Sequence, residues 1–391
     1  MRIAIFAETY LPSVNGVVTH IKVLREGLIA AGHEVLVVTA EPGYKRHVLE
    51  NGVLHCPAKR IKKLYGYGLA NPVSSARSKI VEAFAPDICH IQQEFGIGLF
   101  GARFASKHNK PLVYTLHSMY DEYIFYIAPK PLYPLVEGVL SHYFRYLCRR
   151  AAVITSPSLK ARAFFKRVGA DKEVRLIPNS VEVDEFDYKA VGNAELAKIK
   201  SELGIAPGQT VAVFVGRLGK EKSVDLILRY WADHLKDEKA LRLIIIGEGP
   251  DGEHLRNMAG ELGLAGSVFF KGRVEHVDIA PYFAACDVFV TASLTEMMSI
   301  SMLEGMAAGL PVLQRYDEAN AGQIEEGVNG HNYKTPAEFA EHLKAFAALT
   351  PEEKEKKRAA VRASVLDAGS KRQAEYMLGV YEQAIREHKE K

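Results

Sequence analysis

The sequence has few cysteines, and they are not arranged for chemistry. Its four cysteines lie far apart and form neither a CxxC pair nor a metal-ligand spacing: Cys56, Cys89, Cys148 and Cys286. Neither a disulfide framework nor a zinc site is therefore expected, and reduced thiols fit a cytosolic compartment. The chain also lacks low-complexity tracts and any repeat with the period of a solenoid.

Long apolar runs are missing as well. No run approaches the roughly 18 residues that a membrane span needs. The first residues, MRIAIFAETYLP, have neither the basic segment nor the long apolar segment of a signal peptide. We therefore expect a cytoplasmic protein without a spanning helix.

The net charge of +3 is small but unevenly distributed. Residues 1–178 hold 24 Lys and Arg against 13 Asp and Glu, whereas residues 179–391 hold 26 against 34. A basic half joined to an acidic half suggests that the first half faces an anionic partner, such as a membrane, a nucleic acid or an acidic substrate. Uneven solvated charge without a partner is the alternative.

What is present is a regular alternation of apolar strands and amphipathic helices. A chain of 391 residues is expected to form two domains. In the first half the pattern predicts these strands and helices: strands at 2–8, 33–40, 88–92, 112–117 and 152–157, helices at 17–32, 74–85, 98–108, 132–150 and 159–168. The fold class expected is α/β, with a parallel sheet covered on both faces.

The segment VRLIPNSVEVDEF (174–186) interrupts this rhythm and is interpreted as a linker, after which the alternation restarts. We predict two Rossmann-like, doubly wound domains at residues 1–178 and 179–371, with a C-terminal helix at about 372–391 returning to the first. Such domains bind ligands at the carboxyl ends of their strands, and those ends are expected to face a shared cleft.

Three stretches of the second half carry candidate chemistry. The first, GEGPDG (247–252), matches the dinucleotide pattern GxGxxG. It argues weakly for a dehydrogenase, because it lies deep in the second half and the next strand ends in Lys271 and Arg273 rather than in an acid. The second, VGRLGKEKS, places Arg217 and Lys222 after a strand, where two cations suit a diphosphate, although exposed charged loops are common.

The third stretch, TASLTEMMSISMLEGMAAGLPV, contains Glu296 and Glu304 in otherwise small and apolar surroundings. A helix is expected to begin near Ser299, so that the N–H groups of residues 299–301 can hold a phosphate. Carboxylates suit sugar diols because they accept from two neighbouring hydroxyls. An unpaired Glu304 inside an Ala/Met/Gly helix would be costly, which argues for a polar partner.

Together these features resemble the retaining GT-B enzymes of glycosyltransferase family 4, over the whole chain. The strongest element is Glu-x7-Glu followed by GMAAGLPV, and GRLGKEK, IIIGEGP, IPNS and NGVVTHI accompany it in order. The resemblance implies a nucleotide-sugar donor, with UDP-glucose favoured. It assigns donor contacts to Gly16, Arg217, Lys222, Arg273, Val274, Glu296, Ser299, Ile300, Ser301 and Glu304, and catalytic roles to His117, Arg217, Lys222 and Glu296.

Within that resemblance, two details depart from the family pattern. The run between the glutamates is MMSIS, and the linker reads Asn-Ser instead of Asn-Gly, which leaves the donor sugar open more than the reaction. No cofactor and no metal are expected, because no Asp-x-Asp motif is visible and the cations and the helix start can stabilise the leaving diphosphate.

The first half narrows the resemblance to the bacterial diacylglycerol glucosyltransferases of the family, through TLHSMYDEYIFYI and the N-terminal stretch. Basic and aromatic residues of this half are assigned to the acceptor and the membrane surface: Lys59, Arg60, Lys62, Lys63, Tyr120 and Tyr123. Segments 57–68 and 132–150 suit an anionic bilayer. Packing on the sheet is the alternative for 132–150, and no motif supports a nucleic-acid surface.

The resulting hypothesis is transfer of a hexose to a lipid hydroxyl, with that of diacylglycerol favoured, with retention and at the inner face of the membrane. One alternative is the same donor site acting on a cell-wall, lipid-linked or soluble glycan. A nucleotide-sugar-binding protein without turnover is the alternative of another class.

Overall fold

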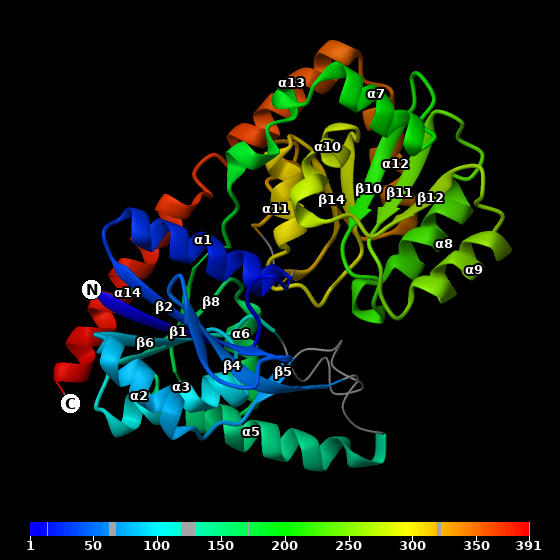
Figure 1. Cartoon of the computed structure of the whole chain (residues 1–391). Coiled ribbons are helices and arrows are strands. Elements are labelled where there is room, and N and C mark those ends of the chain that lie inside the picture. Colours follow the sequence, from blue (N-terminus) through cyan, green and yellow to red (C-terminus); the bar gives the residue numbers. More distant parts are fainter. Residues whose placement is uncertain are drawn as a thin grey trace. The chain divides into compact units, whose positions relative to one another are not determined.

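The computed structural model describes residues 1–13, 15–61, 68–118, 130–170, 172–177, 179–318 and 322–390. The chain forms two compact units, each built around its own sheet (Figure 1). The first unit comprises Met1–Ser180 with Gly369–Lys391, and the second comprises Val181–Ala368. The Val181 amide donates to the Ala368 carbonyl at 2.9 Å, so the chain enters and leaves the second unit at neighbouring residues.

The sheet of the first unit has the strand order β3-β4-β2-β1-β6-β7-β8-β9, and β5 pairs with the end of β4. Within the described residues of this sheet, only the pairs of β4 with β3 and with β5 are antiparallel. The strands are β1 (Arg2–Ala7), β2 (Glu34–Glu41), β3 (Val48–Glu50), β4 (Val53–Arg60), β5 (Gly68–Ala70), β6 (Ile88–Ile91), β7 (Leu112–Thr115), β8 (Val153–Ser156) and β9 (Val174–Leu176). The buried Val/Ile-rich strands are typical of a sheet covered on both faces.

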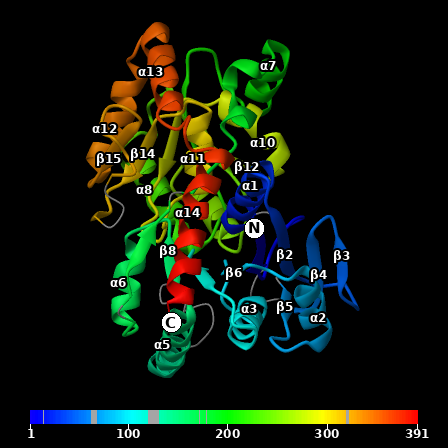
Figure 2. The same ribbon diagram turned by 90° about the vertical axis from the view of Figure 1, so that its left-hand side faces the viewer.

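The helices of the first unit are α1 (Gly16–Ala30), α2 (Ser75–Phe84), α3 (Gly96–Lys107), α5 (Tyr133–Arg150), α6 (Lys160–Arg167) and α14 (Ser370–Lys389). The last of these returns from the far end of the sequence and lies against α1, β7 and β8 (Figure 2). The approach to α1 is close, since a Cβ at Gly27 would lie 2.2 Å from the Ser370 carbonyl oxygen. A glycine is therefore required at this crossing.

The second unit has a parallel sheet in the order β12-β11-β10-β13-β14-β15. Its strands are β10 (Thr210–Val215), β11 (Leu241–Ile246), β12 (Val268–Gly272), β13 (Val288–Thr291), β14 (Val312–Arg315) and β15 (Gly330–Tyr333). Its helices are α7 (Asn193–Glu202), α8 (Val224–His234), α9 (Gly252–Glu261), α10 (Ile279–Ala284), α11 (Ile300–Ala307), α12 (Pro336–Ala347) and α13 (Pro351–Ala363).

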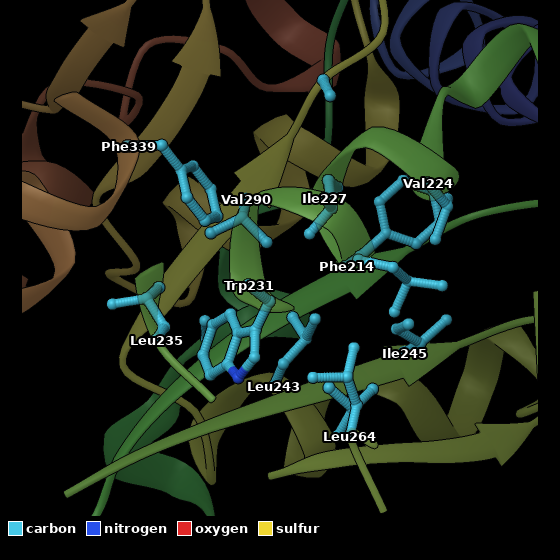
Figure 3. Close-up of a cluster of buried hydrophobic side chains, with 14 of the residues drawn as sticks. Phe214, Val224, Ile227, Trp231, Leu235, Leu243, Ile245, Leu264, Val290 and Phe339 are labelled. Carbon is cyan, nitrogen blue, oxygen red and sulfur yellow. The ribbon is translucent and has the colours of Figure 1, made fainter. Parts of the chain in front are cut away.

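One core of this unit lies where α8 covers the sheet (Figure 3). Trp231, the single tryptophan of the chain, is fully buried there among side chains such as Leu243 and Val290. Its indole Nε1 donates to Ser267 Oγ at 3.2 Å, so its polar atom is satisfied within the core. This packing holds the loops that follow the strands on a rigid base.

The predicted alternation of strands and helices is confirmed in both units, but the prediction of a linker at 174–186 is wrong in part. Its first residues form β9, which pairs with β8, and Val183–Phe186 forms a 3-10 turn. Lys59 and Arg60, which were assigned to the acceptor and membrane surface, end β4 with both side chains exposed. These strands were missed because their apolar runs are short and interrupted by charged residues.

Candidate functional site

The loop after β10 carries two of the predicted cations, and both have carboxylate partners. Arg217 forms an ion pair with Glu221, whose side chain is almost fully buried. The Glu221 carbonyl accepts from Ser293 Oγ at 2.9 Å and from Thr295 Oγ1 at 3.1 Å. Because both hydroxyl residues follow β13, these bonds join two loops at the carboxyl edge of the sheet, where ligands bind in such folds.

The second cation, Lys222, forms an ion pair with Glu296. The two side chains are 22% and 24% exposed, so solvent and ligand can reach both. The sequence predicted a diphosphate contact for Lys222 and a sugar contact for Glu296, and the structure brings the two groups together. Each charge holds the other in place, which fixes a cation and an acceptor side by side.

Helix α11 begins beside this pair in sequence, and its start agrees with the predicted one. Ser299 is the N-cap, and its Oγ accepts from the Met302 amide at 3.3 Å. The Ser301 hydroxyl lies 3.1 Å from Ser299 Oγ. A helix leaves its first N–H groups without partners inside the helix, so those of Ile300 and Ser301 are placed to receive an anion.

Glu304 lies in the second turn of α11 and is 4% exposed. The cost of burying an unpaired carboxylate argued for a polar partner, and the protein itself supplies one, because Glu304 accepts from His276 Nε2 at 2.8 Å. His276 begins a 3-10 turn, His276–Asp278, after β12. No pattern in the sequence predicts this contact, since the two residues are 28 positions apart in different elements.

Arg273 and Val274 lie in the same loop as His276, directly after β12. The Arg273 side chain is 63% exposed and contacts Glu275, with Nε 2.9 Å from Oε1. Val274 packs partly buried against the core that contains α11. Their backbone is therefore held near the start of the turn that supports Glu304, while the Arg273 guanidinium points to solvent.

The glycines of GEGPDG have a packing role. Gly247 has φ +136°, and a Cβ there would lie 1.9 Å from the Gly216 carbonyl oxygen. A Cβ at Gly249 would lie 2.3 Å from the Leu218 carbonyl oxygen. The glycines thus allow the loop after β11 to touch the loop that carries Arg217.

In the first unit, Gly16 is the first residue of α1, and Asn15 caps that helix. The Asn15 Oδ1 accepts from the Val18 amide at 3.0 Å, and its Nδ2 donates to Thr9 Oγ1 at 3.3 Å. The Thr9 amide in turn donates to Gln93 Oε1 at 2.8 Å. These bonds tie the loop around Gly16 to the loop after β6.

His117 follows β7 and contacts that same region, with its Nε2 donating to Gln92 Oε1. The ring of His20 packs edge-on against it, with 4.7 Å between ring centres. Burial, together with the nearby His20 and His90, holds the pKa of His117 well below its usual range. Burial also lowers the pKa of His20 to about 4 and that of His90 to about 3.

All three rings are therefore neutral near pH 7, and because the Nε2 of His117 donates to Gln92, its Nδ1 is left to accept a hydrogen bond. His20 additionally donates from Nδ1 to Asn179 Oδ1 at 2.9 Å and accepts from Gln373 Nε2 at 3.3 Å. Sequence reasoning missed His20 and His90, because neither has a spacing that separates it from an ordinary buried histidine.

The residues assigned to the acceptor and membrane surface are only partly described. Lys62, Lys63, Tyr120 and Tyr123 lie outside the described residues, whereas Lys59 and Arg60 are exposed at the end of β4. No helix in the described part of the chain is both long enough and apolar enough to cross a bilayer.

Comparison with known proteins places the chain in a family. The family model described as "Glycosyltransferase Family 4" matches residues 14–185, and that described as "Glycosyl transferases group 1" matches residues 197–363. The alpha-monoglucosyldiacylglycerol synthase of Acholeplasma laidlawii is 32% identical over 352 residues, which cover 88% of this chain and 87% of that protein. The enzyme of the same name from Streptococcus pneumoniae is 29% identical and covers 89% and 78%.

The fold is likewise that of solved structures. The Anabaena protein HepE, solved in complex with UDP and glucose, superposes with a TM-score of 0.74 at 19% sequence identity, covering 97% of this chain and 99% of that one. The chain is thus a glycosyltransferase with the GT-B fold, and it belongs to glycosyltransferase family 4. The dehydrogenase hypothesis is excluded.

Proposed function

We propose that the protein transfers glucose from UDP-glucose to the free hydroxyl of diacylglycerol, with retention, forming an α-glycosidic bond. The observation that carries the donor part is the ion pair of Lys222 with Glu296 beside the N-terminus of α11. Support for the acceptor comes from the two relatives named as alpha-monoglucosyldiacylglycerol synthases.

The diphosphate of the donor is the group that the cations suit. Lys222, Arg217 and the first N–H groups of α11 stabilise the negative charge that develops as the diphosphate leaves. The carboxylates of Glu296 and Glu304 accept from hydroxyls of the transferred sugar and of the ribose. Because these groups carry the charge, we propose turnover without a metal, which EDTA leaves unchanged.

In the reaction, the bond between the sugar C1 and the phosphate oxygen breaks, and a bond from C1 to the acceptor oxygen forms. The acceptor proton passes to the leaving phosphate, so no protein side chain is needed as general base. In this scheme His117 contributes a hydrogen bond to the transferred sugar, which agrees with the neutral state of its ring. A glutamate nucleophile is not required.

The membrane part of the proposal rests on α5 and on charge. Leu135 and Val139 lie one turn apart on α5 and are 67% and 62% exposed, and Leu132 just before the helix is 47% exposed. The helix ends in Arg149 and Arg150, both exposed. An apolar stripe followed by cations suits an anionic bilayer, where the basic balance of residues 1–178 adds attraction.

Replacing Leu135 and Val139 by aspartate is expected to weaken binding to vesicles of phosphatidylcholine and phosphatidylglycerol about tenfold, because apolar insertion is lost and charge repulsion added. Cosedimentation at two salt concentrations measures this. Leu366→Asp is the matched control, since Leu366 is 57% exposed but lies in the second unit. Equal binding of the double variant and the wild type would contradict the assignment of α5 to the membrane surface.

The test of the whole proposal is UDP release from a panel of UDP-sugars, with and without vesicles that contain diacylglycerol. Turnover of UDP-glucose that requires diacylglycerol, with an α-linked product, supports the proposal. Hydrolysis of the donor that vesicles do not change would reject the lipid acceptor and favour a soluble or polymeric glycan. UDP-sugar binding without product from any acceptor would favour a binding protein.

A further inference from the structure

Glu304 is held by a residue that no part of the proposed reaction uses. Its carboxylate lies within an apolar helix and is 4% exposed, yet its position is fixed by the imidazole of His276 at 2.8 Å. A carboxylate oxygen that accepts one hydrogen bond from a fixed donor leaves other lone-pair positions for a ligand. His276 therefore sets the direction in which the remaining lone pairs of the Glu304 carboxylate can accept hydrogen bonds.

His276 is itself held in place on the other side. Its ring meets the Phe186 ring edge-on, with 6.2 Å between centres and an interplanar angle of 72°. Its side chain is 25% exposed, so it lies at the border between core and surface. The imidazole thus has a fixed orientation rather than a range of solvent-exposed rotamers.

His276 also lies next to the residues that are assigned to the nucleotide base. Residues 273 and 274, assigned to the nucleotide base, directly precede the turn His276–Asp278. Glu304, assigned to the ribose, lies on α11. The His276–Glu304 hydrogen bond therefore joins the segment assigned to the base with the carboxylate assigned to the ribose.

We propose that His276 is a positioning residue for the donor, which sets the Glu304 carboxylate to accept from the ribose hydroxyls of the nucleotide. The inference rests on the proposed function, since it requires a ribonucleotide donor at this site. His276 does not touch the reacting atoms. Replacing His276 is therefore expected to weaken binding of a nucleotide that has ribose hydroxyls. The affinity for a nucleotide that lacks the 2′ and 3′ hydroxyls is expected to stay unchanged.

The experiment compares UDP with 2′,3′-dideoxy-UDP by calorimetry. The wild type is expected to bind UDP about tenfold more tightly than 2′,3′-dideoxy-UDP, because one or two hydrogen bonds from the ribose to a carboxylate contribute a free energy of this size. His276→Phe keeps a ring beside Phe186 but cannot donate, and it is expected to reduce this preference to about twofold by weakening UDP binding only. His276→Gln retains a donor and is expected to keep most of the preference.

The matched control is His331→Ala, because His331 also contacts a glutamate, with Nδ1 3.1 Å from Glu326 Oε2, but is part of β15. This variant is expected to keep the full preference. In kinetics, His276→Phe is expected to raise the KM for UDP-glucose with little change in kcat, as loss of uniform binding does. His276→Asn, whose amide is too short to reach Glu304, replaces His276→Phe if that variant does not fold.

The possible failures are distinguishable. A wild type that binds UDP with a ribose preference, together with a His276→Phe variant that keeps the same preference, would overturn the role of His276 and leave the proposed function standing. A general loss of affinity for both nucleotides would mark His276 as merely structural. A wild type that binds no UDP would remove the proposed donor, and this role with it.

Discussion

Lys222→Ala is expected to lower kcat with UDP-glucose about 10²-fold or more, which is the range for removing a donor from a charge-stabilising site. The Lys222 ammonium forms an ion pair with Glu296, which joins the two loops at the carboxyl edge of the second unit. Its loss removes a positive charge from the leaving diphosphate and also leaves the Glu296 carboxylate without this counterion. Both effects act on the step in which the diphosphate leaves.

The control for this variant lies two residues away. Lys220 belongs to the same 3-10 turn, Lys220–Lys222, and its side chain is exposed. Lys220→Ala makes the same change in net charge and is expected to change kcat less than about twofold, as an exposed charge does. UDP release under saturating donor measures both variants. A Lys222→Ala enzyme that retains more than about a tenth of the wild-type kcat would contradict the assignment of the diphosphate site.

The second large effect is on stability and arises from Glu8, which follows β1 in the first unit. Its side chain is buried, and its Oε1 accepts from the Ile97 amide at 2.7 Å near the start of α3. Burial raises the pKa of Glu8 to about 8, against the opposing effect of the hydrogen bond from Ile97. The nearby Glu94 carboxylate contributes to this rise in the pKa.

The direction in which pH changes the stability follows from which state, folded or unfolded, holds the proton on Glu8. Between pH 4.5, the ordinary pKa of the group, and pH 8, the folded chain keeps a proton that the unfolded chain loses. The free energy of unfolding therefore falls as pH rises through this window, by about 5 kcal/mol. Above the folded-state pKa the contribution no longer changes.

Glu8→Gln is expected to remove this pH dependence, because the amide oxygen still accepts from Ile97 and no proton is lost. Urea unfolding followed by far-UV circular dichroism at pH 5.5, 7 and 8.5 measures the difference between the two proteins. The control is Glu50→Gln, whose side chain is exposed at the end of β3. Parallel pH curves for Glu8→Gln and the wild type would contradict the expectation.

A large part of the fold is predictable because its strands are long and uniformly apolar. The stretch LRLIII of β11 and the buried β1 stand out from the amphipathic helices between them. β5 and β9 are three residues each, and β9 exposes two of its three side chains. Such strands exist because a neighbouring strand supplies hydrogen bonds, which a local pattern does not reveal.

Some features of the candidate site can be predicted from the sequence, and others cannot. The start of α11 is predictable from a serine before an apolar run, since N-caps follow local chemistry. The pairings of Lys222 with Glu296 and of His276 with Glu304 join residues 74 and 28 positions apart. They depend on how loops from different strands meet, and the sequence contains no periodic signal for such contacts. The sequence therefore identified the charged groups but not their partners.

The hydrogen bond between Val181 and Ala368 makes the second unit a continuous segment whose two ends coincide. A segment of this kind can be replaced by the matching segment of another protein, because the replacement needs only two junctions and these lie next to each other. Because Lys222, Glu296 and Glu304 all lie in residues 181–368, transplanting this segment is expected to transfer the nucleotide contacts of the proposed function, whereas Gly16 and His117 stay with the first unit. The scaffold of the first unit, including α14, keeps its covalent order in such a chimaera.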